Sequence, residues 1–483
     1  MTKITYAHTW LGNMKGDILS GLVVALALIP EAIAFSIIAG VDPMVGLYAT
    51  FTICIVIAFV GGRPGMISGA TGAMALLFID LVAGHGLQYL LAATILTGII
   101  QILFGIFKLA RYMKFIPRSV MVGFVNALAI MIFMPQLQHF VGESWVMYVL
   151  AAVTLLIIYL FPYISKTIPS TLVALVVVTS IAIFMNVNVR SVGDIGSISQ
   201  TLPIFLIPQI PINLETLSII FPYALALAIV GLLESLLTAS IVDDSTGTES
   251  DKNVESRGQG IANIITGFFG GMAGCAMIGQ SVINIKSGGR GRTSSLLAGI
   301  FLMLLIVILG DIVVQIPMAA LAGIMIMVAI STFDWNSIRT IHLVPRSDAA
   351  VMIVTVLTVV LTHNLAIGVF TGIILSSIFF VSKISRVHVE SALEGNKRIY
   401  SIRGELFFAS VTELLPKFNY EEASITEVEI NLSRSHIWDD SAVVAIEKIA
   451  ARFRENGKNV EVTGMNEAST ELVGRLHNKL GSH

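Results

Sequence analysis

The sequence predicts an α-helical polytopic membrane protein with a small soluble α/β domain at its C-terminal end. Of the 483 residues, 55% are hydrophobic and only 12% are charged, and the mean hydropathy is +0.86. A soluble domain carries charge on about 25% of its residues. The charges are also unevenly placed, because residues 1–382 hold 32 of the 60 charged residues and residues 383–483 hold 28. This step predicts a transmembrane domain over 1–382 and a soluble domain over 383–483.

A helix that spans a bilayer needs roughly 20 apolar residues. Uncharged runs of about that length recur at 119–142, 144–165, 167–189, 293–310 and 312–333. Residues 349–382 contain no Lys, Arg, Asp or Glu and are interrupted at 362–364, which predicts two helices in a hairpin. Counting the shorter apolar segments as well, we expect about 14 transmembrane segments.

Lysine and arginine gather on one side of the expected path through the membrane. Because cytoplasmic loops carry an excess of these residues, this side is the inner one. The cations concerned are Lys3, Lys15, Lys108, Arg111, Lys114, Arg118, Lys286, Arg290, Arg292, Arg339, Arg346, Lys383 and Arg386. We therefore expect a multi-pass protein of the inner (cell) membrane with both termini in the cytoplasm.

The C-terminal region alternates between strand and helix patterns. Residues 427–432 alternate as a strand, and Asp440 is placed to cap a helix that runs to about Glu455. Residues 459–463 predict a second strand, and residues 466–480 predict a second helix. The region contains no glycine-rich phosphate loop, so we expect no cofactor there.

Two membrane segments, which begin at Ser68 and at Gly274, are too short and too polar to be plain spans. Interrupted, glycine-rich segments in the two halves of a transporter indicate a binding site at the membrane midplane. A helix that starts inside the membrane exposes unpaired N–H groups and about half a positive charge, which attract an anion without any Lys or Arg. The alternative is that the glycines only permit close helix packing. We expect the substrate-binding residues to include Ala70, Thr71, Met277, Ile278, Gly279, Gln280 and Ser281.

Two carboxylates, Glu31 and Glu234, lie inside apolar stretches. A charge at the bilayer centre costs roughly 2.5–3.5 kcal/mol on insertion scales, so an acid at this depth indicates a function. Thr238 lies four residues after Glu234, on the same face of that helix. We expect Glu234, Thr238 and Glu31 to bind a coupling ion, either a proton or Na⁺. The alternative is a structural hydrogen bond between helices from a protonated glutamate.

The sequence disfavours several other classes of function. The net charge of −2 suggests no nucleic-acid partner, and Cys54 and Cys275 have neither disulfide nor metal-site spacing. No nucleophile–base pair accompanies the interrupted segments, so we expect no enzyme activity. The acidic run 243–252 lacks the spacing of an EF-hand, and we expect a solvated connecting loop there.

Several motifs, in order along nearly the whole chain, resemble the sulfate permease (SulP) family of anion transporters. Residues 30–35 (PEAIAF), followed by 46–48 (GLY), look like the first-helix signature of that family. Residues 68–71 (SGAT) and 281–289 (SVINIKSGG) look like parts of its broken third and tenth helices. Residues 430–432 (INL) and 438–442 (WDDSA) are similar to the strand, loop and helix of a STAS domain.

The resemblance implies 14 segments in two inverted repeats of seven, with a core domain that moves against a gate domain. It also implies a cytoplasmic STAS domain over 383–483, with a possible cytoplasmic partner, and a homodimer. By the same resemblance, Phe35, Thr71 and Ser281, together with Glu31, line the substrate site. Glu234 takes the position of the coupling carboxylate on the eighth segment.

The sequence departs from the family pattern at three positions. Many relatives have an arginine at the position of Gln280, and animal relatives have a glutamine at the position of Glu31. With one cation fewer and one acid more, the site suits an anion only if a proton or sodium ion enters too, which favours symport over uncoupled flux. Asp440 stands where stand-alone STAS regulators carry a phosphorylated serine, which argues against phospho-regulation at that position.

The leading interpretation is a secondary active symporter that carries a small anion, such as bicarbonate, sulfate or a dicarboxylate, by alternating access. A nucleobase–proton symporter of the same fold is a second interpretation, which the missing arginine favours and the STAS tail disfavours. A third is a membrane scaffold or sensor that acts through the STAS domain. The third is disfavoured because a pure anchor has no use for two buried acids.

Overall fold

The computed structural model describes residues 6–111, 116–165, 168–196, 198–422 and 424–480. Lys3 and Lys114, which contribute to the expected orientation, lie outside these ranges. The chain divides into two compact units, residues 1–373 and 374–483. Helix α16 (Leu365–Ile384) crosses this division, and the first strand after it begins at His388. The expected boundary near Lys383 therefore falls in the last turn of α16.

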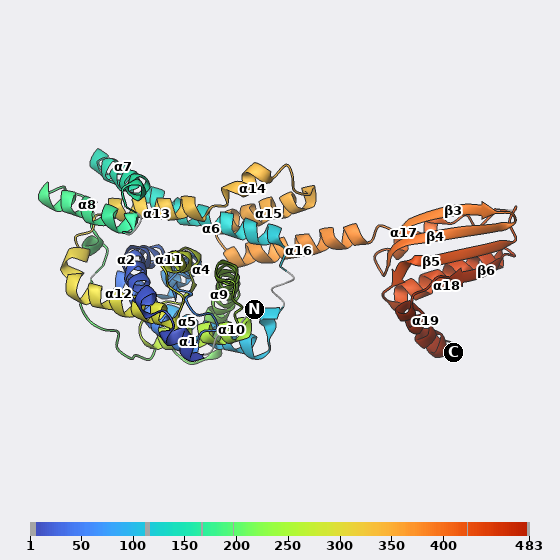
Figure 1. The fold of residues 1–483 in the computed structure, drawn as a ribbon, viewed down its shortest axis with the longest axis horizontal. Coiled ribbons are helices and arrows are strands. Elements are labelled where there is room, and N and C mark those ends of the chain that lie inside the picture. Colours follow the sequence, from blue (N-terminus) through green and yellow to red (C-terminus); the bar gives the residue numbers. More distant parts are fainter. Residues whose placement is uncertain (1–5, 112–115, 166–167, 197, 423, 481–483) are drawn as a thin grey trace. The chain divides into compact units, whose positions relative to one another are not determined.

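The first unit consists of two series of helices that follow one another in the chain (Figure 1). After the short α1 (Tyr6–Leu11), the first series is α2 (Met14–Ile38), α3 (Pro43–Val60), α4 (Gly72–His85), α5 (Leu87–Ile106), α6 (Arg118–Gln138), α7 (Trp145–Leu160) and α8 (Ser170–Phe184). The second is α9 (Leu214–Thr246), α10 (Lys252–Phe268), α11 (Ile278–Lys286), α12 (Arg292–Val313), α13 (Met318–Thr332), α14 (Trp335–Thr340), α15 (Arg346–Thr362) and α16.

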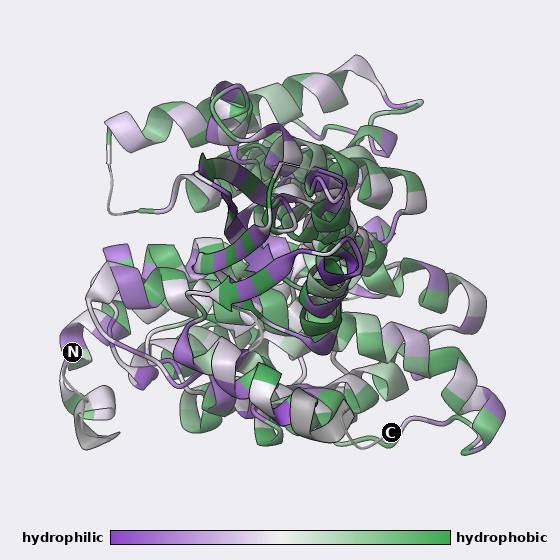
Figure 2. Ribbon diagram, turned by 90° about the vertical axis from the view of Figure 1, so that its right-hand side faces the viewer, coloured by the Kyte–Doolittle hydropathy of each residue, from purple (hydrophilic) through white to green (hydrophobic). Residues whose placement is uncertain are grey.

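Nine helical stretches of the described chain are long and apolar enough to cross a membrane. They are α2, α3, α5, α6, α7 with the turn Phe161–Tyr163, α9, α12, α13 with α14, and α16. The shorter helices α4, α8, α10, α11 and α15 occupy the remaining positions of the 14 expected segments. Figure 2 shows the hydrophobic residues along these helices. The helical membrane fold is confirmed, and the number of crossings stays a prediction.

The contacts between helices come in couples that reflect an internal repeat. Helix α2 packs against α12, and their counterparts in the other series, α9 and α5, also pack against each other. In the same way, α3 packs against α12, and the counterparts α10 and α5 pack against each other. Likewise α6 packs against α15 as α13 packs against α7. Each couple is generated by exchanging one series for the other, helix by helix, when the short α14 is left out of the second series. This is the pattern expected of two structural repeats.

The helices of the first unit pack in two groups (Figure 1). Helices α2–α5 pack with α9–α12 and form the group that contains both interrupted segments. Helices α6, α7, α8, α13 and α15 form the second group. The groups touch where α2 meets α8 and α13, and where α4 meets α6. These two groups correspond to the expected core and gate domains.

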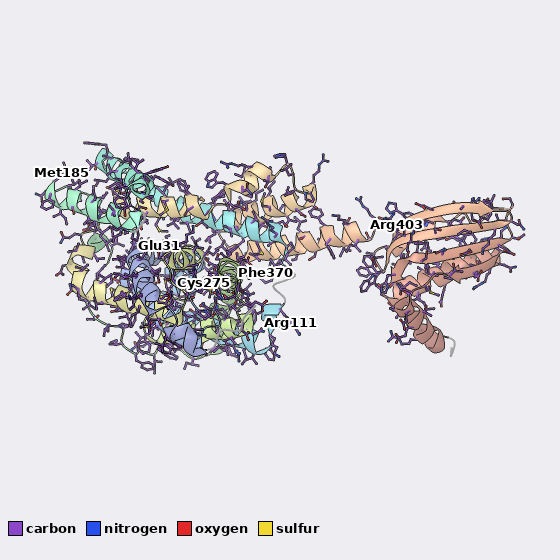
Figure 3. All side chains as sticks on the ribbon, in the orientation of Figure 1. Glu31, Arg111, Met185, Cys275, Phe370 and Arg403 are labelled. Atoms are coloured by element: carbon purple, nitrogen blue, oxygen red, sulfur yellow. The ribbon has the colours of Figure 1, made fainter. Side chains whose placement is uncertain are left out.

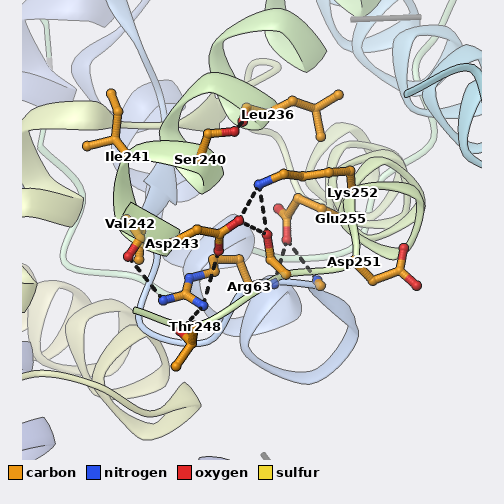
Figure 4. Close-up of polar contacts among 12 residues, drawn as sticks. Arg63, Leu236, Ser240, Ile241, Val242, Asp243, Thr248, Asp251, Lys252 and Glu255 are labelled. Atoms are coloured by element: carbon orange, nitrogen blue, oxygen red, sulfur yellow. Dashed lines mark hydrogen bonds and ion pairs between the residues drawn. The ribbon is translucent and has the colours of Figure 1, made fainter. Parts of the chain in front are cut away.

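The acidic run 243–252 contains the end of α9 and a largely exposed connection to α10, as the sequence predicts, and ion pairs at its two ends hold it in place. Helix α9 continues to Thr246, and Lys252 Nζ contacts Asp243 Oδ2 at 2.6 Å (Figure 4). Arg63, which is 7% exposed, contacts Asp243 Oδ1 at 3.2 Å and donates to Thr248 Oγ1 at 2.7 Å. Glu255 Oε2 accepts from the backbone N–H of Arg63 at 3.0 Å. These contacts fix the loop that leads from α3 into the first interrupted segment.

The second unit contains a four-stranded sheet in the order β3-β4-β5-β6. The strands are β3 (His388–Glu394), β4 (Lys397–Leu406), β5 (Glu427–Ile437) and β6 (Asn459–Thr463), of which β3 and β4 are antiparallel and the other neighbours parallel. The helices are α17 (Val411–Leu414), α18 (Asp440–Glu455) and α19 (Glu467–Leu480). The two predicted strands and both predicted helices are confirmed. Strands β3 and β4 were not predicted from the sequence.

The predicted cap of α18 is wrong by one residue. The N-cap is Asp439, whose Oδ1 accepts from the backbone N–H of Ala442 at 2.9 Å and whose Oδ2 accepts from that of Phe408 at 2.7 Å. Asp440 lies in the first turn and accepts from the neighbouring Ser441 N–H. The cap is displaced because the extended residue before the helix, and not the first helical residue, aims its side chain at the free amides.

Asp439→Ala should therefore destabilise α18 by about 0.5–2 kcal/mol, the usual effect of removing a cap. Hydrogen–deuterium exchange of the α18 amides in the full chain measures this loss. Asp440→Ala is the matched control, and we expect a smaller effect. If Asp440→Ala accelerates exchange as much as Asp439→Ala does, the assignment of the cap is wrong.

Candidate functional site

The two interrupted segments meet as a pair of short strands, β1 (Ser68–Gly69) and β2 (Cys275–Ala276). They pair antiparallel, with Ser68 opposite Ala276 and Gly69 opposite Cys275. This register is unchanged when the strands are exchanged, as expected of inverted repeats. Helix α4 begins three residues after β1, and α11 begins two residues after β2. Two helix N-termini therefore lie next to one strand pair, and each contributes about half a positive charge.

Polar side chains from the surrounding helices satisfy the backbone of these strands. Thr50 Oγ1 accepts from the N–H of Ala70 at 3.1 Å, and Ser235 Oγ accepts from that of Ala276 at 3.0 Å. Asn263 binds both backbone groups of Gly274, at 2.9 and 3.1 Å. Irregular backbone at membrane depth is tolerated only with such partners. These residues were not predicted from the sequence. A polar Asn inside a membrane helix is nevertheless a signal that could have indicated a role for Asn263.

Glu234 lies in the middle of α9 and contacts the second interrupted segment. Its side chain is 7% exposed, and Cys275 Sγ donates to Glu234 Oε2 at 3.0 Å. Thr71 Oγ1, at the N-cap of α4, lies 3.2 Å from Cys275 Sγ. A chain of hydrogen bonds thus connects the start of α4 to the buried carboxylate. Thr238 takes no part in this chain, because its hydroxyl donates to the backbone carbonyl of Glu234 at 2.7 Å.

If the coupling ion that Glu234 is expected to bind is a proton, replacing Cys275 by alanine should move the half-maximal pH of transport to a more alkaline value. The variant removes a donor that favours the ionised carboxylate of Glu234, so protonation becomes easier. A weak thiol donor is worth about 1 kcal/mol, which corresponds to a shift of up to about one pH unit. Cys275→Ser is the matched control, because a hydroxyl restores the donor. A pH profile of uptake that is identical in wild type and Cys275→Ala would contradict this role.

The second carboxylate, Glu31 on α2, contacts the same interrupted segment (Figure 3 labels Glu31 and Cys275). Gln280 Nε2 donates to Glu31 Oε1 at 2.6 Å. Gln280 is 3% exposed, and its Oε1 has no hydrogen-bond partner among the residues that the structure describes. A buried polar atom left unpaired costs about 1–3 kcal/mol. Residues 275–280 therefore supply one hydrogen-bond donor to each of the two acids, the half-buried Glu31 and the buried Glu234.

The remaining predicted site residues divide into buried and accessible positions. Phe35, Ala70, Met277 and Ser281 are buried, Ile278 is half-buried, and Gly279 is exposed. Ser281 Oγ accepts from the backbone N–H of Ile67 at 3.0 Å, so it joins the two interrupted segments. The ring of Phe35 lies against the start of α4, because a Cβ added to Gly72 would come within 3.0 Å of it. A Cβ added to Gly279 would meet no atom within 4 Å.

Two structural repeats and two interrupted helices that meet head to head, with two acids beside them, are the construction of a membrane transporter. The sulfate permease family profile matches residues 14–146 and 143–355, and the STAS domain profile matches residues 389–479. The chain belongs to the sulfate permease family of transporters and ends in a STAS domain. The predicted family and the prediction that this is not an enzyme are confirmed.

Relatives of known name agree with this assignment. YbaR of Bacillus subtilis (strain 168), which carries a provisional sulfate-transporter name, is 60% identical over 98% of this chain and 99% of its own length. The bicarbonate transporter BicA of Picosynechococcus sp. (strain ATCC 27264 / PCC 7002 / PR-6) is 30% identical over 78% of this chain and 72% of its own length.

Two solved structures share the fold. The transmembrane domain of a cyanobacterial bicarbonate transporter BicA has a TM-score of 0.67 and 28% identity, and covers 77% of this chain and 98% of that one. The murine Slc26a9 anion transporter in its inward-facing state has a TM-score of 0.84 over 98% of this chain and 88% of that one. Its identity of 17% makes this a likeness of fold alone.

Proposed function

We propose that this chain is a secondary active symporter that carries a small anion, sulfate, bicarbonate or a dicarboxylate, together with a proton or sodium ion. The observation that carries the proposal is the pair of acids formed by the half-buried Glu31 and the buried Glu234, each hydrogen-bonded to the interrupted segment 275–280. An anion placed at the helix N-termini would meet two acids at close range. A cation bound to one of them offsets that repulsion, which makes the entry of the two ligands interdependent.

Alternating access in this proposal moves the core group of helices against the gate group. The proposed site, made of the N-termini of α4 and α11 together with Glu31 and Glu234, belongs to the core group, because α4, α11, α2 and α9 all pack there. Its polar backbone groups are bound by residues of the same group, such as Thr50, Ser235 and Asn263. The site can therefore move as one body while its exposure to the two sides of the membrane changes. This supports a transporter over a scaffold, which needs no such construction.

Two observations favour an inorganic anion as the substrate: the free amides at the N-terminus of α11 and the names of the relatives. The N-cap of α11 makes no side-chain hydrogen bond, so its first amides remain available to an anion. The relatives described above are named for sulfate and bicarbonate, which favours an inorganic anion over a nucleobase.

Uptake into proteoliposomes tests the proposal. We expect accumulation of labelled sulfate, bicarbonate or a dicarboxylate when an inward proton or sodium gradient is imposed, and only equilibration without one. A panel that includes uracil distinguishes the nucleobase interpretation. Gradient-driven uptake of uracil without uptake of any anion would overturn the proposal.

We also propose the setting in which the transporter works. Residues 1–382 form the transport domain in the inner membrane, and residues 383–483 form a cytoplasmic STAS domain that is available to a cytoplasmic partner. Both termini then lie in the cytoplasm, as the Lys and Arg distribution favours. We propose a homodimer, which cross-linking in native membranes can test.

Deleting the chain after about Val389 should leave measurable transport at a reduced rate or expression level. In this proposal every residue of the substrate site belongs to membrane segments, so the STAS domain can only modulate the rate. Sulfate and bicarbonate binding to the purified truncated protein, compared with the full chain, measures the effect. If the truncated protein is monodisperse and folded but binds neither anion, the site assignment is wrong.

A further inference from the structure

The pair formed by Glu31 and Gln280 leaves one buried amide atom unused. Gln280 Nε2 donates to Glu31, while Gln280 Oε1 has no partner among the described residues. A primary amide carries its donor and its acceptor on opposite sides of one carbon atom. Half a turn about the last side-chain torsion exchanges the two positions. The same two side chains can therefore pair in two ways that differ only in which amide atom faces Glu31.

The charge state of Glu31 decides between the two arrangements. An ionised carboxylate only accepts hydrogen bonds, so it holds the Nε2 of Gln280 toward itself. A protonated carboxyl group gains an O–H donor, which pairs with Oε1 instead. A sodium ion on the carboxylate requires the same turn, because hard cations are ligated by oxygen and not by an N–H group. In both cases the amide N–H moves to the position that Oε1 occupies now.

The residue that bears this amide lies in the N-terminal turn of α11. Gln280 is the third residue of the helix and follows Gly279, which is exposed and has open space beside it. The backbone amides of the same turn have no side-chain cap. An N–H from Gln280 would therefore add a donor beside the helix end that attracts an anion. An oxygen in the same place would repel it.

We propose that Gln280 is a cation-operated switch of the anion site: its amide donates to the anion when Glu31 carries a proton or sodium ion, and presents its oxygen when Glu31 is ionised. The inference rests on the proposed function and names the residue that links the two ligands. It makes cation and anion binding favour each other without any fixed positive charge in the site.

Among the described residues, no charged group forms a hydrogen bond or ion pair with Glu31. The charge of Glu31 itself therefore controls this switch. On the elements packed against α2, Tyr48 bonds to Thr201 and Cys54 to Ser68. The remaining titratable groups of α2 and its neighbours lie in the first turn or last two turns of their helices: Lys15, Asp17, Asp80, His85, Lys286, Arg292 and Asp311. None of these forms a hydrogen bond or ion pair with Glu31 in the described ranges.

Binding of labelled sulfate and oxalate to the purified full chain tests the switch, at mildly acidic and mildly alkaline pH, with and without sodium. Both probes keep their charge over this range. Wild type should bind more tightly when protons or sodium are abundant, by about tenfold to hundredfold, the effect of one hydrogen bond to a charged group. Binding measured with and without sodium at alkaline pH, where protons are scarce, shows whether sodium or the proton operates the switch.

Glu31→Gln should bind the probes about as tightly as wild type with its cation and should lose the part of the cation dependence that passes through Gln280, so that any dependence left is due to Glu234. The introduced amide can donate to Gln280 Oε1 at any pH, so the anion-binding arrangement needs no cation. Gln280→Met, which keeps the length of the side chain without its amide, should bind weakly under all conditions. The double variant should behave as Gln280→Met does, because the amide acts between Glu31 and the anion.

Two results overturn the switch alone: a Glu31→Gln variant that keeps the wild-type cation dependence, or a Gln280→Met variant that binds as tightly as wild type with its cation. Gln280→Leu provides a second variant if Gln280→Met is not monodisperse. Wild type that binds neither probe under any condition would overturn the proposed function as well. The two failures are therefore distinguishable in one experiment.

Discussion

Glu234→Gln is expected to abolish gradient-driven accumulation of the anion while the protein stays folded and inserted. The amide keeps the shape of the side chain and still accepts from Cys275 Sγ, which lies 3.0 Å from the carboxylate. It cannot take up a proton, and it offers a sodium ion no negative charge. Without a cation on Glu234 the anion still meets a site whose affinity Glu31 can tune, but the cation that is carried on Glu234 is missing, so accumulation should fall to equilibration. Removing a chargeable group at membrane depth also makes insertion more favourable, by up to roughly 3 kcal/mol.

Counterflow and gradient-driven uptake, measured side by side in proteoliposomes, separate coupling from folding. We expect the variant to exchange anion across the membrane and to lose only the accumulation. Glu215→Gln is the matched control, because Glu215 lies exposed in the first turn of the same helix α9. It should accumulate anion as wild type does. Accumulation at the wild-type level by Glu234→Gln would remove Glu234 from the coupling mechanism.

Gln280→Arg is expected to strengthen anion binding at alkaline pH and to weaken its dependence on protons or sodium. The guanidinium would stand within reach of Glu31, whose Oε1 lies 2.6 Å from the present amide nitrogen. A unit charge about 4 Å from an anion is worth about 4 kcal/mol at an effective dielectric constant near 20, before desolvation is subtracted. Even a third of that energy corresponds to about tenfold in affinity. The fixed charge takes over the electrostatic role of the cation.

Titrations of sulfate binding across pH and sodium concentration, on wild type and variant, measure this change. The arginine should raise affinity most where the wild type lacks its cation, so the two binding curves should converge at acidic pH. Gln280→Met distinguishes the added charge from the lost amide, since it removes the amide without adding a charge. A Gln280→Arg variant with unchanged affinity and unchanged cation dependence would show that Gln280 does not face the anion.

Much of the fold and part of the site can be predicted from the sequence, because their signals are local. The cost of a charge in an apolar helix singles out Glu31 and Glu234. Glycine and small polar residues mark the interruptions at Ser68–Thr71 and Gly274–Ser281. Alternation and helical periodicity identify β5, β6, α18 and α19, which are confirmed. None of these inferences requires knowledge of which segments become neighbours.

The pairing of distant residues is decided by the tertiary structure alone. The contacts of Glu234 with Cys275 and of Glu31 with Gln280 join residues 41 and 249 positions apart, and β1 pairs with β2 across the repeats. Thr238 is predicted from the sequence to share the coupling-ion site with Glu234, and only the structure shows that its hydroxyl donates to the backbone carbonyl of Glu234. Composition and periodicity report whether a residue is buried, whereas its hydrogen-bond partner depends on how helices from the two repeats cross.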